Sequence, residues 1–441
     1  MARDLLIIGG RIIDADQNID AAGDLLISDG KFSQIGSPGT LPSKNADVID
    51  AAGCIVCQGF IDLHCHLRDP GFEEKETIAT GTKAAAAGGF TTVCCMPNTN
   101  PPIDSRASVE YVIRTAAQSG TIRVLPIGCI TKGRKGAELS EMYDLADAGV
   151  IGFSDDGSTV ANPQLLQKAM EYSRTLGLPI IEHCEDPMLA KDGYMHEGWV
   201  STRLGLKGVP TAAEEVIIAR DIALAQLTKA KLHIAHVSTA GSVEMIRRAK
   251  EAGISITAEV TPHHLTLTHE RVMRTGRGNR SELLYDTNAK VNPPLRTEED
   301  IAALIAGLKA GVIDCIATDH APHHEIDKLC EFGLAAFGIS GFETALGSLM
   351  TLVHNGHLDM KALIAALTAV PSRILGKNYG IPAGIKIGST ADIVIFDPDK
   401  EWTVRSSDFA SKGKNTPLEG QALKGKVKAT IYYGAVVYSE G

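Results

Sequence analysis

Short apolar runs alternate with longer segments of helical spacing through the middle of the chain. Between most of the runs lie Ala-rich amphipathic segments such as 73–87, 164–175 and 211–228, with glycines near their ends. Near-continuous apolar strands that alternate with helices indicate a parallel sheet covered on both faces, and eight such units predict a (β/α)8 TIM barrel. The eight runs are residues 56–64, 91–96, 122–128, 150–154, 179–183, 232–237, 254–260 and 314–318.

The two ends of the chain have a different pattern. Residues 1–55 and 384–441 contain short apolar strands separated by turn residues, with no helical segment between them. We therefore expect one small β-sandwich domain built from both termini, and a barrel domain over residues 56–383.

Composition and charge exclude several classes of protein. The 441 residues are 44% hydrophobic and 22% charged, which is typical of a globular protein and excludes a disordered or fibrous one. A net charge of −10 argues against a nucleic-acid partner. No run approaches the roughly 20 apolar residues of a membrane span, and the first residues do not resemble a signal peptide. These features predict a cytoplasmic protein with no membrane partner.

The nine cysteines do not suggest disulfides, because the count is odd and several lie inside apolar runs. Cys54 and Cys57 form a C-x-x-C pair, but no second pair follows at zinc-finger spacing. We expect both to pack in the core.

Chemistry-bearing residues gather where the predicted strands end. The first run ends in an H-x-H pair, and strand alternation places Asp62, His64 and His66 on one face. Carboxylates or histidines also end or follow the fourth, fifth, sixth and eighth runs: Asp155, Asp156, His183, His236 and Asp319.

The carboxyl ends of the strands of a TIM barrel converge on the active site. Four histidines and two carboxylates there exceed what one tetrahedral zinc ion uses, so we predict two divalent metal ions, with zinc as the preferred metal. A carboxylate can bridge such a pair, and a water shared between the ions becomes a hydroxide nucleophile near neutral pH.

Other polar groups near these strand ends predict a receptor for a carboxylate. They are Arg68, Asn98, Asn292 and His323, of which the arginine can bind both oxygens of a carboxylate. His263 and His264 follow the seventh run, where support of a metal ligand and simple packing are both open. We assign no role to His196, His233, His269, His354 or His357.

The motifs together resemble the amidohydrolase superfamily and, within it, the dihydroorotases. The resemblance covers nearly the whole chain, and the motifs occur in the order GFIDLHCHLRDPGFEEKETI, MPNTNPP, GFSDDGS, EHCED, AHVST, TPHHL, KVNPPLR and ATDHAPH.

The resemblance implies a role for each matched residue. It implies that His64 and His66 bind the first metal, that His183 and His236 bind the second, and that Asp319 is both a ligand and the general acid/base. Substrate contacts are implied for Arg68, Asn98 and His323 at the carboxylate, for Asn292 on a covering loop, and for Phe337 and Gly338 through their backbone.

The chain departs from many relatives in the superfamily, which bridge the metals with a carboxylated lysine. GFSDDG contains no lysine, and the resemblance implies an aspartate bridge. The spacing of 27 residues to His183 favours Asp156, with Asp155 as the alternative.

The activity implied is reversible hydrolysis of the cyclic amide of dihydroorotate to N-carbamoyl-L-aspartate, in pyrimidine biosynthesis, by a metal-bridged hydroxide. The alternatives are a hydantoinase, a dihydropyrimidinase or an allantoinase, which share the barrel and the metals, and a non-catalytic scaffold for aspartate carbamoyltransferase. Arg68 argues against substrates that lack a carboxylate. A homo-oligomer, and association with aspartate carbamoyltransferase, are also expected.

Overall fold

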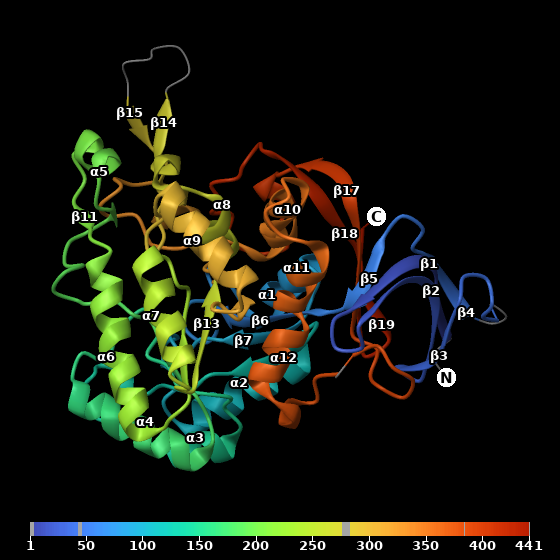
Figure 1. The fold of residues 1–441 in the computed structure, drawn as a ribbon, viewed down its shortest axis with the longest axis horizontal. Coiled ribbons are helices and arrows are strands. Elements are labelled where there is room, and N and C mark those ends of the chain that lie inside the picture. The colour runs from blue at the N-terminus through green and yellow to red at the C-terminus, as the bar shows by residue number, and fades with distance from the viewer. Residues whose placement is uncertain (1–3, 43–45, 276–282, 383, 441) are drawn as a thin grey trace.

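The computed structural model describes residues 4–42, 46–275, 283–382 and 384–440 (Figure 1). It is a mixed α/β structure in which most helices gather in one body, while strands from both termini form a sheet beside it. The two ends of the chain therefore lie in the same part of the molecule.

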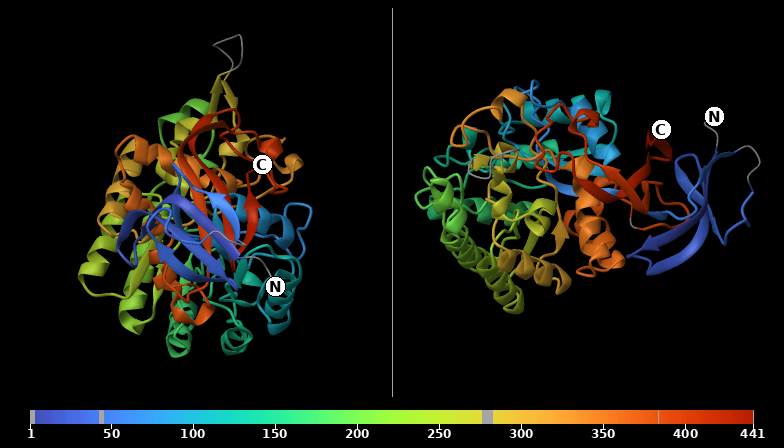
Figure 2. Two further views of the ribbon diagram at one scale, coloured as in Figure 1. Left: turned by 90° about the vertical axis from the view of Figure 1, so that its right-hand side faces the viewer. Right: turned by 90° about the horizontal axis from the view of Figure 1, so that it is seen from above.

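The terminal sheet joins segments from opposite ends of the sequence. Its order is β19-β18-β17-β5-β1-β2-β3, and β4 pairs with β1. The link between the two ends is β5, which pairs antiparallel with β17 and parallel with β1. Figure 2 shows the N-terminal strands in blue beside the C-terminal strands in red. The strands are β1 (Asp4–Asp14), β2 (Ile19–Ser28), β3 (Lys31–Gly36), β4 (Ala46–Asp50), β5 (Ile55–Gln58), β17 (Ile393–Thr403), β18 (Ala422–Tyr432) and β19 (Ala435–Ser439).

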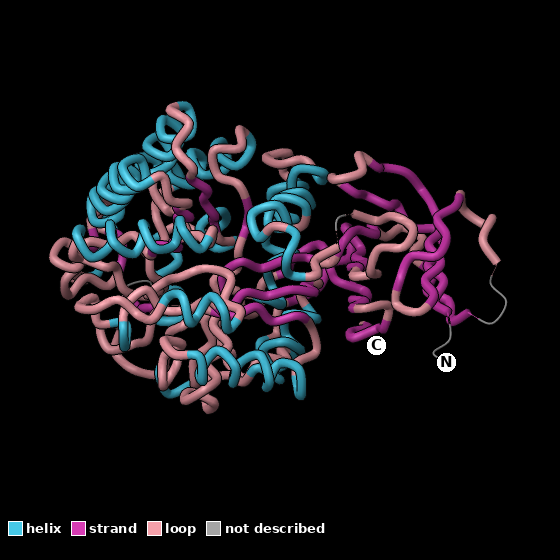
Figure 3. The backbone as a smooth tube through the Cα atoms, turned by 90° about the horizontal axis from the view of Figure 1, so that it is seen from below, coloured by secondary structure: helices cyan, strands magenta, loops and turns pink. Residues whose placement is uncertain are grey.

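Parallel strands occupy the interior of the helical body, as Figure 3 shows. Three of them pair in the order β6-β7-β8 and four in the order β16-β13-β12-β9. Single-residue parallel bridges link Phe153 to Gly128 and Ile180, and Cys65 to His320. The strands are β6 (Phe60–Cys65), β7 (Phe90–Cys95), β8 (Arg123–Pro126), β9 (Ile180–Glu182), β12 (Leu232–Ile234), β13 (Ile256–Val260) and β16 (Cys315–Ile316).

Two of the predicted runs do not form one continuous strand each. Residues 150–154 form no continuous strand; Phe153 bonds both neighbouring segments, but Asp155 already turns away to accept hydrogen bonds from Ile130 and Thr131. The run 56–64 divides at Gly59 between β5 and β6. A Cβ atom on Gly59 would lie 2.2 Å from the Thr91 side chain, so glycine is needed at this crossing between sheets.

The helices begin where the sequence supplies capping residues. Thr77 and Thr80 form a capping box at α1, so this helix starts after the acidic residues of the predicted segment 73–87. Asn162 caps α4, with Pro163 in its first turn. The helices are α1 (Ile78–Ala87), α2 (Arg106–Ser119), α3 (Met142–Ala148), α4 (Pro163–Leu176), α5 (Trp199–Leu204), α6 (Ala212–Thr228), α7 (Ala240–Glu251), α8 (Pro262–Thr266), α9 (Glu298–Lys309), α10 (Phe342–His354), α11 (Met360–Leu367) and α12 (Ala369–Leu375).

Several short elements lie in the loops. Within the part of the chain that is described, no helix is long and apolar enough to cross a membrane. The short strands and 3-10 turns are β10 (Met195–His196), β11 (Gly208–Val209), β14 (Met273–Thr275), β15 (Leu283–Tyr285), η1 (Lys132–Arg134), η2 (His269–Val272), η3 (Thr287–Ala289), η4 (Glu325–Asp327), η5 (Lys377–Tyr379) and η6 (Ser406–Asp408).

A buried aromatic group packs the helical body against the terminal sheet. Phe60 contacts Phe90 with ring centroids 5.7 Å apart and Phe396 at 6.2 Å, and Phe90 contacts Phe342 at 5.4 Å. All nine cysteines are free, and all except Cys330 are buried, including Cys54 and Cys57. The cysteines therefore serve as small apolar residues, as their positions in the sequence predict.

Candidate active site

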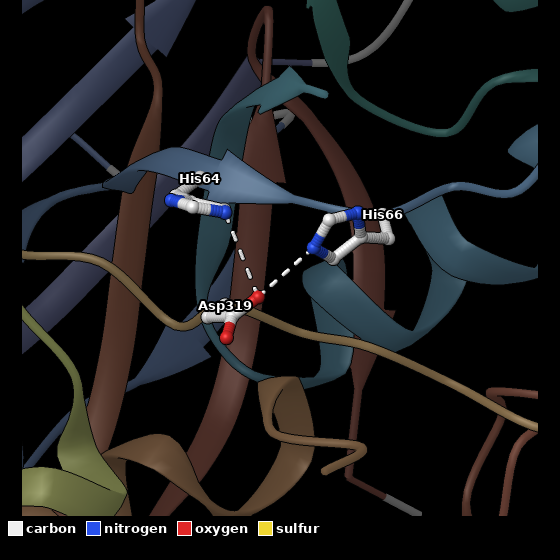
Figure 4. Close-up of side chains that lie close together, drawn as sticks. All are labelled: His64, His66 and Asp319. Atoms are coloured by element: carbon white, nitrogen blue, oxygen red, sulfur yellow. Dashed lines mark hydrogen bonds and ion pairs between the residues drawn. The ribbon is translucent and has the colours of Figure 1, made fainter. Parts of the chain in front are cut away.

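The H-x-H pair and Asp319 meet at the ends of neighbouring strands (Figure 4). The Oδ1 atom of Asp319 lies 2.9 Å from His66 Nε2 and 3.6 Å from His64 Nε2. All three side chains are buried. Their geometry follows from strand alternation, which turns both imidazoles to one face, and from the hydrogen bond between Asp319 N and His64 O.

Asp156 connects this group to the histidines of two further strands. Its Oδ1 atom lies 3.3 Å from His64 Nε2 and 3.8 Å from both His236 Nε2 and His183 Nδ1. The last two nitrogens are 2.9 Å from each other. All six predicted metal ligands thus form one buried cluster.

The two aspartates of the GFSDDG segment point to different places. Asp155 accepts hydrogen bonds from the backbone of Ile130 and Thr131 and from the Thr131 hydroxyl, which occupies its carboxylate away from the cluster. Asp156 alone of the pair faces the histidines. This placement favours Asp156 over Asp155 as the shared ligand.

Strained backbone holds some of these side chains in place. His236 has a φ of 33° and Asp319 a φ of 45°, both in the left-handed region that non-glycine residues rarely adopt. Such conformations persist where surrounding structure enforces them and often mark functional sites.

The donor atoms of the cluster suit metal ions. His64 Nδ1 faces Glu259 Oε1 at 2.7 Å and His66 Nδ1 faces Asn98 Oδ1 at 2.9 Å, which leaves Nε2 of each ring as the atom directed at the carboxylates of the cluster. His64 Nε2 and Asp156 Oδ1 are both buried and have no hydrogen-bond partner among the described residues. A divalent cation would satisfy both atoms. Two overlapping groups have this character: His64, His66 and Asp319, and His64, Asp156 and His236.

The protonation states of Asp156 and His183 also suit metal binding, whereas burial alone would lower the pKa of His64 but the Asp156 and Glu259 carboxylates raise it well above its ordinary value. Burial alone would raise the pKa of Asp156, but His64 and His236 hold it well below its ordinary value. Burial and the neighbouring His236 lower the pKa of His183 to about 3. An ionised carboxylate and a neutral imidazole are the forms that bind metals.

A cavity of about 200 Å³ opens beside the cluster. Its lining includes the cluster residues His66, Asp156, His183, His236 and Asp319 and the predicted substrate contacts Arg68, Asn98, Asn292, His323, Phe337 and Gly338.

Arg68 and His323 lie side by side in the lining of this cavity. Arg68 donates from Nε to the Pro322 carbonyl at 3.2 Å, and its Nη2 lies 3.3 Å from His323 Nε2. Burial lowers the pKa of Arg68 to about 10, so it remains charged at neutral pH. Burial and the charge of Arg68 lower the pKa of His323 to about 2, so this ring is neutral.

The remaining predicted contacts frame the cavity. Asn98 donates to Asp156 at 3.3 Å, and Asn292 Nδ2 lies 3.3 Å from His183 Nε2. Phe337 is half-exposed at the rim, and its carbonyl lies 2.8 Å from His323 Nε2. Gly338 has a φ of 140°, and a Cβ atom at this position would lie 2.7 Å from both Ala321 Cβ and the Ala321 carbonyl oxygen.

Three residues near the cluster, Glu259, His233 and His264, make contacts that the sequence did not predict. Glu259, in β13, accepts from His64 and from His233, whose Nε2 lies 3.1 Å from the carboxylate. His233, which the sequence analysis left without a role, therefore holds the partner of a predicted ligand. A lone carboxylate in the apolar run 254–260 was the available signal. His264 contacts the Pro293 carbonyl at 2.9 Å and so supports the Asn292 loop.

Solved structures of cyclic amidohydrolases resemble this chain over its whole length. An L-hydantoinase (dihydropyrimidinase) from Arthrobacter aurescens superposes with a TM-score of 0.86 at 25% identity, covering 100% of this chain and 97% of that one. The dihydropyrimidinase from Brevibacillus agri gives a TM-score of 0.83 at 23% identity, covering 99% and 95%. The fold is thus shared with these enzymes.

Sequence relatives are closer. Residues 53–242 match the family described as Dihydro-orotase-like. The dihydroorotase of Caldanaerobacter subterraneus is 53% identical over 99% of this chain and 97% of the relative, and that of a Geobacter species is 49% identical over 99% and 100%. With this identity over nearly the full length and the ligand cluster in place, the chain belongs to the dihydroorotase family.

Proposed function

We propose that the chain catalyses the reversible hydrolysis of dihydroorotate to N-carbamoyl-L-aspartate, a step of pyrimidine biosynthesis. One observation carries the choice of substrate: a single cavity is lined both by residues of the His/Asp cluster and by the buried, charged Arg68. A cyclic amide with a carboxylate substituent has one group for the cluster and one for Arg68.

Two divalent ions, with zinc preferred, would be held by the cluster. His64 and His66 would bind the first ion and His183 and His236 the second, with Asp156 between them and Asp319 as a further ligand. Bound there, the ions would supply Lewis-acid chemistry, which polarises a carbonyl and lowers the pKa of water. Glu259 supports this proposal because its contact fixes the orientation of the His64 ring.

Asp319 is the proposed proton carrier. Its carboxylate is buried at the cavity and takes a proton from the attacking water as the new C–O bond forms. The ring C–N bond then breaks, and Asp319 returns that proton to the leaving nitrogen. Proton uptake and release balance within one turnover.

Arg68, Asn98 and His323 are the proposed carboxylate site, and Asn292, Phe337 and Gly338 the proposed contacts to the rest of the substrate. Nε of Arg68 already donates to the Pro322 carbonyl, so the two Nη atoms are the donors that can bind both carboxylate oxygens. Binding of the carboxylate at Arg68 would orient the ring amide toward the His/Asp cluster.

We also propose that the parallel strands form a closed (β/α)8 barrel over residues 56–383, beside a β-sandwich of 1–55 and 384–441. The bridges at Phe153 and between Cys65 and His320 support closure. The strand β5 reaches across the boundary at residue 56. We further propose a cytoplasmic homo-oligomer that associates with aspartate carbamoyltransferase. Mass measurement of the protein alone and with that enzyme tests both associations.

The second candidate is a hydantoinase or dihydropyrimidinase, because the solved structures reported above carry those names. An allantoinase shares the same chemistry, and a non-catalytic scaffold would not need a complete ligand cluster. An assay of the purified protein decides between these candidates. It compares the hydrolysis of dihydroorotate, hydantoin, dihydrouracil and allantoin, with metal content measured in parallel. We expect turnover of dihydroorotate and preference for it; preference for a ring without a carboxylate refutes the proposal.

A further inference from the structure

The loop between β17 and β18 leaves the terminal sheet and reaches the helical body (Figure 1). It packs directly against the segment that follows the eighth parallel strand. A Cβ atom on Gly413 would lie 2.4 Å from Pro322 Cβ, so only glycine allows this approach. Ser411 donates to Glu76 at 2.5 Å and anchors the loop a second time. The C-terminal segment therefore forms part of the support of the cavity.

Asn415, in this loop, bonds two segments that line the cavity, one containing His323 and the other Gly338. Its Oδ1 accepts from His323 N at 2.9 Å and from the Ser340 hydroxyl at 2.9 Å. Its Nδ2 donates to the Ala321 and Gly338 carbonyls, each at 3.0 Å. The side chain is 4% exposed, and all four of its hydrogen-bonding positions are used.

The chemistry of these partners requires an amide. His323 N can only donate, and the two carbonyls can only accept, so Oδ1 and Nδ2 cannot exchange places. A carboxylate of the same shape would put an oxygen against two carbonyl oxygens. Asn415 thus joins the His323 segment to the Gly338 segment in one relative position.

We propose that Asn415 is a positioning residue for substrate binding, acting through His323 and the Gly338 backbone without touching the substrate. The inference rests on the proposed function, since it assigns Asn415 to the wall that binds the substrate carboxylate. The terminal sheet consequently contributes to substrate recognition as well as to the fold.

The test is Asn415→Asp, measured by steady-state kinetics on dihydroorotate and by calorimetric binding of N-carbamoyl-L-aspartate. We expect KM and the product Kd to rise at least about tenfold, while kcat stays within about threefold of the parental value and metal content is parental. This pattern is expected when the lost interaction binds the ground state and the transition state equally. Asn162→Asp makes the same chemical change at the exposed cap of α4, where Asp also caps, and should leave every value parental.

Ser340→Ala removes one of the four bonds and is the second variant, needed where Asn415→Asp does not fold. It should raise KM about twofold to threefold, the size expected for one neutral hydrogen bond of roughly 0.5 kcal/mol. The inference is overturned if a folded Asn415→Asp has parental KM and Kd. If Asn415→Asp does not fold, parental values in Ser340→Ala overturn it. So does a fall in kcat that follows metal loss. A parent protein without dihydroorotate turnover overturns the proposed function first, and this inference with it.

Discussion

Arg68→Ala is the sharpest test of the proposed substrate. The guanidinium is buried and stays charged at neutral pH; its Nε donates to the Pro322 carbonyl, and its Nη2 lies 3.3 Å from His323 Nε2. A hydrogen bond to a charged group contributes about 1.5–3 kcal/mol, and two would be lost. Since each 1.4 kcal/mol is about tenfold, and Asn98 and His323 retain part of the binding, kcat/KM for dihydroorotate should fall about tenfold to a thousandfold.

The same variant separates recognition from chemistry. Metal content should be unchanged because Arg68 is not a predicted ligand, and any hydrolysis of the uncharged dihydrouracil should change little. Arg68→Lys keeps a charge but loses the planar fork, so it should recover only part of the activity. Arg106→Ala, at an exposed ion pair with Asp144, is the matched control and should be parental. Near-parental dihydroorotate turnover by Arg68→Ala would refute the carboxylate site and return the assignment to hydantoinase-like substrates.

The other predictions concern the cluster and the core. Elemental analysis should find two metal equivalents per chain, and metal loading should not depend on bicarbonate. Asp156→Ala should lose metal and activity, and Asp155→Ala should have a milder effect; the reverse order would make Asp155 the bridge. Glu259→Gln should lower metal affinity about tenfold to a hundredfold in a chelator competition, because it weakens the partner of His64; parental affinity would contradict that role. Gly338→Ala should lower kcat/KM, since its Cβ would lie 2.7 Å from the Ala321 carbonyl oxygen; an active variant would mean that this segment can shift. Thiol titration should find one fast group in native protein, at Cys330, and nine after denaturation without reductant; fewer would reveal a disulfide.

Local rules account for the part of the site that the sequence predicts well. Strand alternation places His64 and His66 on one face. Because the carboxyl ends of parallel strands meet at one edge of the sheet, His183, His236 and Asp319 lie near them. None of these placements needs knowledge of a distant contact. The structure accordingly brings all of them into one cluster.

Contacts between distant segments account for what the sequence does not predict. Asn415 is 92 residues from His323 along the chain, and no local pattern distinguishes it from a surface loop residue. Glu259 and His233 lie on neighbouring strands, where only the register of pairing brings their side chains together. The run 150–154 has the composition of a strand, but hydrogen bonds made by Asp155 end it early.

The terminal sheet has a consequence for how the protein is made. The strand β5 is synthesised early, yet its antiparallel partner β17 follows more than three hundred residues later. At about 5–20 residues per second, a nascent chain spends on the order of tens of seconds on the ribosome with that strand edge unpaired. Exposed edges invite association with other chains, so newly made protein should depend on chaperones during this interval. The loop that carries Asn415 emerges later still, and the cavity therefore gains its full support only when synthesis is almost complete.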